Sequence, residues 1–109
     1  MPTQTFYDLL AVSAERAQSG KLYREFLRIP ALSAGVYVLA AGATDPQKPH
    51  KEDELYYVVR GRAKMLVSSE EQVVKTGTVI FVPANVEHRF FDISEELEVL
   101  VFFAPAETE

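Results

Sequence analysis

From Lys21 onward, the sequence is a succession of short runs rich in Val, Tyr, Phe and Leu. Glycine, proline, asparagine and serine separate these runs, as they do in turns between β-strands. Many short strands at close spacing are typical of a sandwich or barrel and not of alternating strands and helices. With 109 residues, the chain has room for one core. We therefore predict an all-β fold with strands over residues 22–29, 35–41, 54–60, 63–68, 72–75, 78–82, 88–92 and 97–104.

The first twenty residues follow a different pattern, which is typical of a helix. Apolar residues recur there at helical spacing, namely Phe6, Leu9, Leu10, Ala14 and Ala17. Gly20 then closes the segment, so we predict one amphipathic helix over about Tyr7–Gln18. We expect this N-terminal segment (1–20) to pack on a barrel formed by residues 21–109, and a partner-binding helix is the alternative.

Composition excludes several classes of site and partner. The sequence has no cysteine, so any bound metal must be held by nitrogen and oxygen ligands. A net charge of -5 disfavours contact with a nucleic-acid backbone. No apolar run approaches the roughly 20 residues that cross a bilayer. Residues 1–5 also lack the basic and apolar regions of a secretory signal. We expect a cytoplasmic protein that binds small molecules, and neither nucleic acid nor membrane.

The only two histidines of the chain, His50 and His88, each stand beside a predicted strand. Residues two apart in an extended chain share a face, so His50 and Glu54 point the same way. If the strand that begins at His88 lies alongside, two imidazoles and one carboxylate meet on the inner face of the barrel. That set leaves positions open for water or substrate and suits Fe(II), Mn(II), Zn(II) or Ni(II). Spacing alone does not choose among these metals, and isolated histidines are more often surface residues.

The segments around these residues resemble the two motifs of the cupin superfamily. The first motif, G-x5-H-x-H-x3,4-E-x6-G, is matched at Gly42, His50, Glu54 and Gly61. The second, G-x5-P-x-G-x2-H-x3-N, is matched at Gly77, Pro83 and His88. The resemblance implies a small single-domain cupin, which is a double-stranded β-helix or jelly-roll barrel. It also implies one divalent metal ion on the matched ligands, a small-molecule ligand or substrate, and commonly a homodimer.

The sequence departs from these motifs at three positions. Asn85 replaces the inner glycine of the second motif and Asp92 its final asparagine. Asparagine tolerates left-handed turns, so Asn85 costs the fold little. Lys48 stands where the first motif has its first histidine, and an ammonium group has no lone pair for a metal.

Gln47 is the candidate that completes the ligand set, through its carboxamide oxygen. One alternative is that Gln47 is an exposed loop residue. The other is that Lys48 points into the pocket and replaces the charge of the metal.

Other residues near the motifs have expected roles. Tyr56 shares the face of Glu54, and we predict that it shapes the pocket or hydrogen-bonds the substrate as a catalytic residue. Phe90 follows His88 on the same face, and Tyr37 is a further candidate for the pocket. We expect Glu52 and Asp53 to form a solvated acidic turn, and Arg60 and Arg62 to flank a tight turn at Gly61. The last strand is apolar on both faces, which indicates burial in the barrel on one side and under the helix or a partner subunit on the other.

These observations favour a small metal-dependent enzyme that acts on a small organic molecule. With iron, the ligand set suits oxygenase-like chemistry, and with zinc or manganese it suits isomerase or lyase chemistry. The alternatives are a non-catalytic module that binds a small ligand with a structural metal, and a barrel whose metal site is lost.

Overall fold

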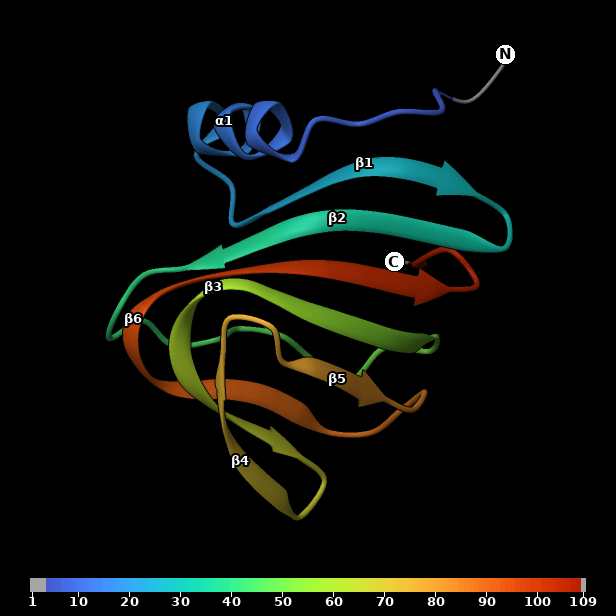
Figure 1. The fold of residues 1–109 in the computed structure, drawn as a ribbon. Helices are drawn as coiled ribbons and strands as arrows, with labels where there is room; N and C mark the ends of the chain where they lie inside the picture. Colours follow the sequence, from blue (N-terminus) through green and yellow to red (C-terminus); the bar gives the residue numbers. More distant parts are fainter. Residues whose placement is uncertain (1–3, 109) are drawn as a thin grey trace.

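The computed structural model describes residues 4–108 and confirms a mostly β fold with one short helix. Within this range the order of elements is α1 (Leu9–Ser19), β1 (Tyr23–Ile29), β2 (Leu32–Leu39), β3 (Asp53–Val67), β4 (Glu70–Lys75), β5 (Val79–Val82) and β6 (His88–Ala104) (Figure 1). The strands form one antiparallel sheet in the order β1-β2-β6-β3-β4, and β5 also pairs with β3.

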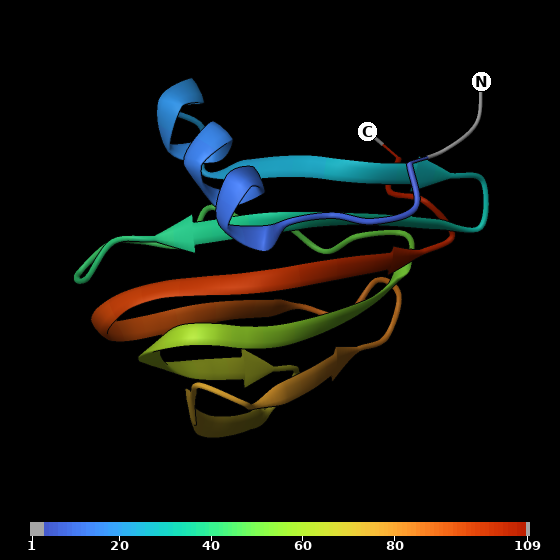
Figure 2. The same ribbon diagram turned by 45° about the horizontal axis from the view of Figure 1, so that its top comes forward.

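Two long strands, β3 and β6, curl this sheet into a barrel. Each of them joins two of the strands that we predicted as separate. Residues 97–104 of β6 lie between β2 and the first half of β3, whereas residues 88–91 pair with the second half of β3. Register shifts between Val58 and Lys64 bend β3 at its middle. Figures 1 and 2 show the two halves of each strand turning toward each other across the interior.

The predicted tight turn at Gly61 is wrong, because β3 runs on through this residue. Gly61 has a φ of 101°, which favours glycine. A Cβ atom at this position would collide with the carbonyl oxygen of Glu96 on β6. The glycine therefore lets two bent strands cross closely, and Arg60 and Arg62 project from the strand toward solvent.

The core lies between the two halves of the curled sheet. Along the first half of β3, buried and exposed residues alternate, as expected for a strand with one face inside. Tyr56 and Phe90 are 0% and 1% exposed, and their ring centroids lie 5.1 Å apart. Their predicted interior position is confirmed. The inward residues of β6, among them Val99 and Phe103, complete this cluster.

Helix α1 packs on the outer face of β1 and β2 (Figure 2). Asp8 caps its first turn by accepting a hydrogen bond from the amide of Leu10, and Gly20 ends it in a left-handed conformation. Val12 is the buried residue of the helix and packs against Val36 and Val38.

The apolar helix face that we predicted is largely wrong. Phe6 and Leu10 are 85% and 81% exposed. The helix instead presents Leu9, Val12 and Ser13 to the sheet, because the hydroxyl of Ser13 donates to the buried carboxylate of Glu98 at 3.0 Å. Leu100 of β6 packs against the same cluster as Val12. No helix in residues 4–108 has the length and apolar character needed to cross a membrane.

Candidate metal centre

Strands β3 and β6 bring the three predicted metal ligands to one place inside the barrel. Glu54 lies at the start of β3, His88 opens β6, and both side chains are buried. His50 precedes β3 and is partly buried. One donor atom from each residue lies within 4.8 Å of those of the other two. The amide of Asn85, which has the left-handed backbone we expected, ties the two motif segments together by donating to the carbonyl of His50.

The hydrogen bonds of His88 leave one ring nitrogen free to bind a cation. Its Nδ1 donates to the carbonyl oxygen of Val86 at 2.9 Å, so Nε2 of the neutral ring carries a lone pair. That Nε2 lies 3.2 Å from Oε1 of Glu54. Within residues 4–108, this nitrogen and both oxygens of Glu54 are buried without a hydrogen-bond partner. Facing lone pairs of this kind fit a cation between them, which is either a proton or a metal ion.

The same contacts shift the pKa of His88. Burial alone lowers this pKa, but the contact with Glu54 and the hydrogen bond to Val86 outweigh burial and raise the pKa above 6.5. In the metal-free protein, at pH values below this raised pKa, a proton on Nε2 offsets the charge of Glu54, and a metal ion competes with that proton.

Gln47 points its carboxamide oxygen toward the cluster. Its Nε2 donates to Asp45 at 3.2 Å, and its Oε1 accepts from the hydroxyl of Tyr56 at 3.0 Å. These two bonds fix which end of the amide faces His50, whose Nε2 lies 3.4 Å from Oε1. The alternative of an exposed loop glutamine does not hold, whereas coordination by Gln47 stays a prediction.

Lys48 does not enter the site. Its side chain is exposed, and Lys48 is not among the residues that line the neighbouring cavity. The alternative in which a lysine ammonium replaces the charge of the metal is therefore wrong.

Sequence reasoning missed Asp45, which holds the loop in place. Asp45 is 8% exposed and accepts hydrogen bonds from the hydroxyl of Tyr37 at 2.7 Å and the amide of Phe90 at 2.9 Å. It also accepts from the backbone amide and the side chain of Gln47. The signal in the sequence was the dipeptide Asp45-Pro46 in a loop, because aspartate before proline commonly turns the chain by binding the amide two residues on.

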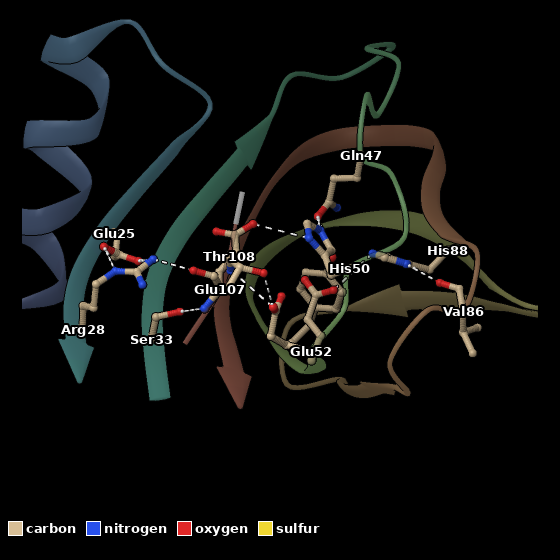
Figure 3. A network of polar contacts seen from close by, with 12 residues as sticks. Glu25, Arg28, Ser33, Gln47, His50, Glu52, Val86, His88, Glu107 and Thr108 are labelled. Carbon is tan, nitrogen blue, oxygen red and sulfur yellow. Dashed lines mark hydrogen bonds and ion pairs between the residues drawn. The ribbon is translucent and has the colours of Figure 1, made fainter. Parts of the chain in front are cut away.

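Sequence reasoning also missed Glu107, which reaches the site from beyond the last strand. Its Oε2 lies 3.4 Å from Nδ1 of His50, and its amide donates to Ser33 at 2.9 Å (Figure 3). Arg28 donates to its carbonyl oxygen at 2.7 Å. A carboxylate that accepts from Nδ1 leaves the lone pair on Nε2, the nitrogen that faces Gln47. Burial, followed by the charges of neighbouring glutamates, raises the pKa of Glu107.

The expected solvated turn at Glu52 and Asp53 is half wrong. Asp53 is exposed, but Glu52 is 4% exposed. Its Oε2 accepts from the hydroxyl of Thr108 at 2.6 Å and from the amide of the same residue at 3.3 Å. Glu52 is therefore buried because the C-terminal segment folds back over it and satisfies one of its oxygens (Figure 3).

A cavity of about 300 Å³ adjoins the cluster. Its walls include Tyr23, Val101 and Phe103, and Gln47, His50 and Glu107 are among its polar lining residues. The hydroxyl of Tyr23 is buried and has no hydrogen-bond partner within residues 4–108. Tyr37 also lines this cavity, as we predicted.

Tyr56 is not among the lining residues, because its side chain is wholly buried behind Gln47. Burial and the nearby charge of Glu54 raise the pKa of Tyr56 well above its ordinary value, so its hydroxyl keeps the proton it donates to Gln47.

Comparisons with known proteins agree with this architecture. An uncharacterised protein of Streptomyces coelicolor is 50% identical over 97 residues, which cover 89% of this chain and 92% of that protein. A solved RmlC-like cupin with a double-stranded β-helix fold from Methanocaldococcus jannaschii superposes with a TM-score of 0.68 at 20% identity, covering 76% of this chain and 78% of that one.

An enzyme is also among the similar structures. A DMSP lyase from Ruegeria pomeroyi has a TM-score of 0.66 at 23% identity, covering 70% of this chain and 39% of the lyase. Residues 35–104 match the Cupin domain family, and this range contains both motifs and all three clustered ligand residues. The chain belongs to the cupin family.

Proposed function

We propose that this protein is a metal-dependent enzyme that acts on a small organic molecule. The observation that supports it most is the buried cluster of His50, Glu54 and His88, in which both carboxylate oxygens and an imidazole nitrogen have no hydrogen-bond partner within residues 4–108. An apolar cavity reaches this cluster at His50, beside Gln47. A polar cluster at the end of an apolar cavity is the usual form of a small-molecule site.

Each residue of the site has a separate role in this proposal. His50, Glu54 and His88 would hold the ion, and Gln47 would add a fourth oxygen ligand. A divalent ion supplies Lewis acidity, or redox chemistry with dioxygen when the ion is iron. Tyr56 acts from behind by fixing the orientation of Gln47. The chemistry would be oxygenase-like if the ion is iron, and of the isomerase or lyase type if the ion is zinc or manganese.

One observation favours a second candidate, a non-catalytic module that binds a small ligand. Tyr56, which we predicted to be catalytic, does not line the cavity and is engaged by Gln47. Burial raises the pKa of the lining hydroxyls of Tyr23 and Tyr37, so Glu107 and His50 are the other described lining groups able to move a proton. A cavity with so few proton-transfer groups also fits a protein that binds its ligand without converting it.

Elemental analysis of protein purified without a metal-affinity tag tests the proposal. We expect one equivalent of a transition metal in the wild-type protein and none in the double variant His50→Ala, His88→Ala. A Lys48→Ala variant, altered in the same loop at an exposed side chain, should retain the metal. Wild-type protein that takes up no metal after incubation with Fe, Mn, Ni and Zn salts would refute the metal site.

The identity of the metal then directs the search for activity. Iron calls for measurements of oxygen uptake in the presence of candidate substrates, and zinc or manganese calls for isomerase and lyase assays. A metal-loaded protein that binds small molecules but turns over none of them would support the binding module.

We also propose that the protein forms a homodimer through the outer face of β3 and β5. On this face Leu55 pairs with Phe81 and Tyr57 pairs with Val79, and the four side chains are 39–58% exposed. A contiguous apolar face of this kind favours association. Light scattering should give a dimer for the wild type and a monomer for Phe81→Lys. A matched Val73→Lys change on β4 should stay dimeric, and a monomeric wild type would exclude the dimer.

A further inference from the structure

The cavity beside the ligand cluster contains an acidic side chain but no strongly basic one among the described residues. Among the described residues, those that line it include one carboxylate, that of Glu107, and no lysine or arginine. Phosphate and carboxylate groups of ligands are generally held by arginine, lysine or helix N-termini. None of these recognition groups lines the cavity, so it lacks the means by which a protein usually holds an anion.

The arginine nearest to Glu107 is already engaged. Arg28 donates to both carboxylate oxygens of Glu25, at 3.0 and 2.9 Å, and to the carbonyl oxygen of Glu107 at 2.7 Å. Figure 3 shows it on the β1 side of Glu107, away from His50. Its side chain is half exposed and does not line the cavity. Arg28 therefore fixes the backbone of the C-terminal segment and does not offer its charge to a ligand.

The carboxylate of Glu107 stands among other negative charges. Glu52 and Glu54 are both buried, and both act on Glu107 through their charges. A ligand carboxylate brought next to this group would meet like charges in a partly buried setting, which costs more than in water. Glu107 is therefore positioned to repel anions and to accept a hydrogen bond.

The polar end of the cavity selects ligands with two properties. Glu107 accepts a hydrogen bond, so the ligand must carry a donor, and a metal ion on the neighbouring cluster needs a lone pair. A carboxylate has lone pairs but no proton to donate. An ammonium group has protons but no lone pair, and a cation next to it repels it. A hydroxyl group has both a donor and lone pairs without a net charge.

We propose that the cavity binds a small, uncharged alcohol or phenol. Its hydroxyl lies at the end formed by Glu107, His50 and Gln47, and its apolar body lies against Tyr23, Val101 and Phe103. This assignment rests on the proposed function and deepens it by naming the substrate class.

Three probes of nearly equal size test the assignment: benzyl alcohol, benzoate and benzylammonium. Their binding is followed by the amide NMR shifts of Val101 and Phe103, in the metal-free protein and in the zinc-loaded protein. In the metal-free protein we expect benzyl alcohol to bind at least about tenfold more tightly than benzoate, as expected when a like charge is buried beside Glu107. In the zinc-loaded protein, benzyl alcohol should bind more tightly than benzylammonium.

The variant Glu107→Gln tests whether Glu107 causes the preference for benzyl alcohol over benzoate. Glutamine keeps the shape and an acceptor oxygen but removes the charge, so the preference over benzoate should shrink to less than about threefold. The control Glu96→Gln changes an exposed carboxylate that pairs with Arg60 and does not line the cavity, and it should leave the preference unchanged.

Several results would overturn the assignment. These are benzoate binding as tightly as benzyl alcohol in the metal-free protein, benzylammonium binding more tightly than benzyl alcohol to the zinc-loaded protein, or an unchanged preference in Glu107→Gln. A different result, namely a protein that takes up no zinc, would contradict the proposed metal-dependent function. The metal-free protein would then still report the preference of the cavity itself.

Discussion

Asp45 should contribute to stability far more than its place in a loop suggests. It accepts hydrogen bonds from the hydroxyl of Tyr37 and the amide of Phe90, and both of these residues are buried. The change Asp45→Ala leaves both donors without their partner, at about 1–3 kcal/mol for each. We therefore expect the free energy of unfolding to fall by about 2–6 kcal/mol.

A milder variant keeps this prediction measurable. Asp45→Asn retains one acceptor oxygen and loses the charge and the second acceptor, so about half of that loss is expected, or ~1–3 kcal/mol. The control Asp53→Ala removes an exposed carboxylate that accepts from the exposed end of the β5–β6 loop, and it should cost less than ~1 kcal/mol. Urea unfolding followed by circular dichroism gives all three values.

The change Asp45→Asn should also weaken metal binding, because the side-chain nitrogen of Gln47 loses its acceptor oxygen on Asp45. Metal affinity of folded Asp45→Asn, measured by competition with a chelator, should fall by about 10–100-fold. If Asp45→Asn unfolds at the same urea concentration as Asp53→Ala and binds metal as tightly as the wild type, the role assigned to Asp45 is wrong.

The remaining predictions concern protons, the outer ligand shell and the bend. The pKa of His88 is raised above 6.5, so protonated His88 stabilises the metal-free protein. This contribution is fully present below pH 6.5 and is lost as the pH rises through the raised pKa. Metal affinity runs the other way and should increase with pH over this range, and a chelator titration with no such dependence would contradict it. Glu107→Ala should lower metal affinity by about 10–100-fold, measured in the same way, because His50 loses its Nδ1 partner. Gly61→Ala should unfold at lower urea concentration than Gly77→Ala, since both have positive φ but only Gly61 has no room for a Cβ atom. Equal midpoints would show that the crossing of β3 and β6 does not require glycine.

The strands and the three clustered ligands were predictable from local pattern. Alternation of apolar residues fixes the inward face of β3, so Glu54 and Tyr56 could be placed inside before the fold was known. His50, Glu54 and His88 could be grouped because the segments around them resemble the two cupin motifs, which hold the metal ligands of that family at these positions. The bend at Gly61 was misread as a turn, because a positive-φ glycine serves a turn and a strand bend equally well.

The surroundings of the ligands were not predictable, because they depend on contacts between distant parts of the chain. Glu107 meets His50 only after the C-terminal segment is tied to Ser33 and Arg28. Glu52 looked like part of an acidic turn, and only Thr108 makes its burial possible. The helix face was misjudged for a similar reason, since the sheet beneath it decides which side is covered.

A crystal of the protein grown with Mn²⁺, with data collected for anomalous scattering, tests the metal site most directly. We expect one strong anomalous peak within coordination distance of Nε2 of His50, Nε2 of His88 and a carboxylate oxygen of Glu54. Oε1 of Gln47 should complete the set. A peak elsewhere, or a proton-bridged His88–Glu54 pair with no peak at saturating Mn²⁺, would contradict the proposed metal centre.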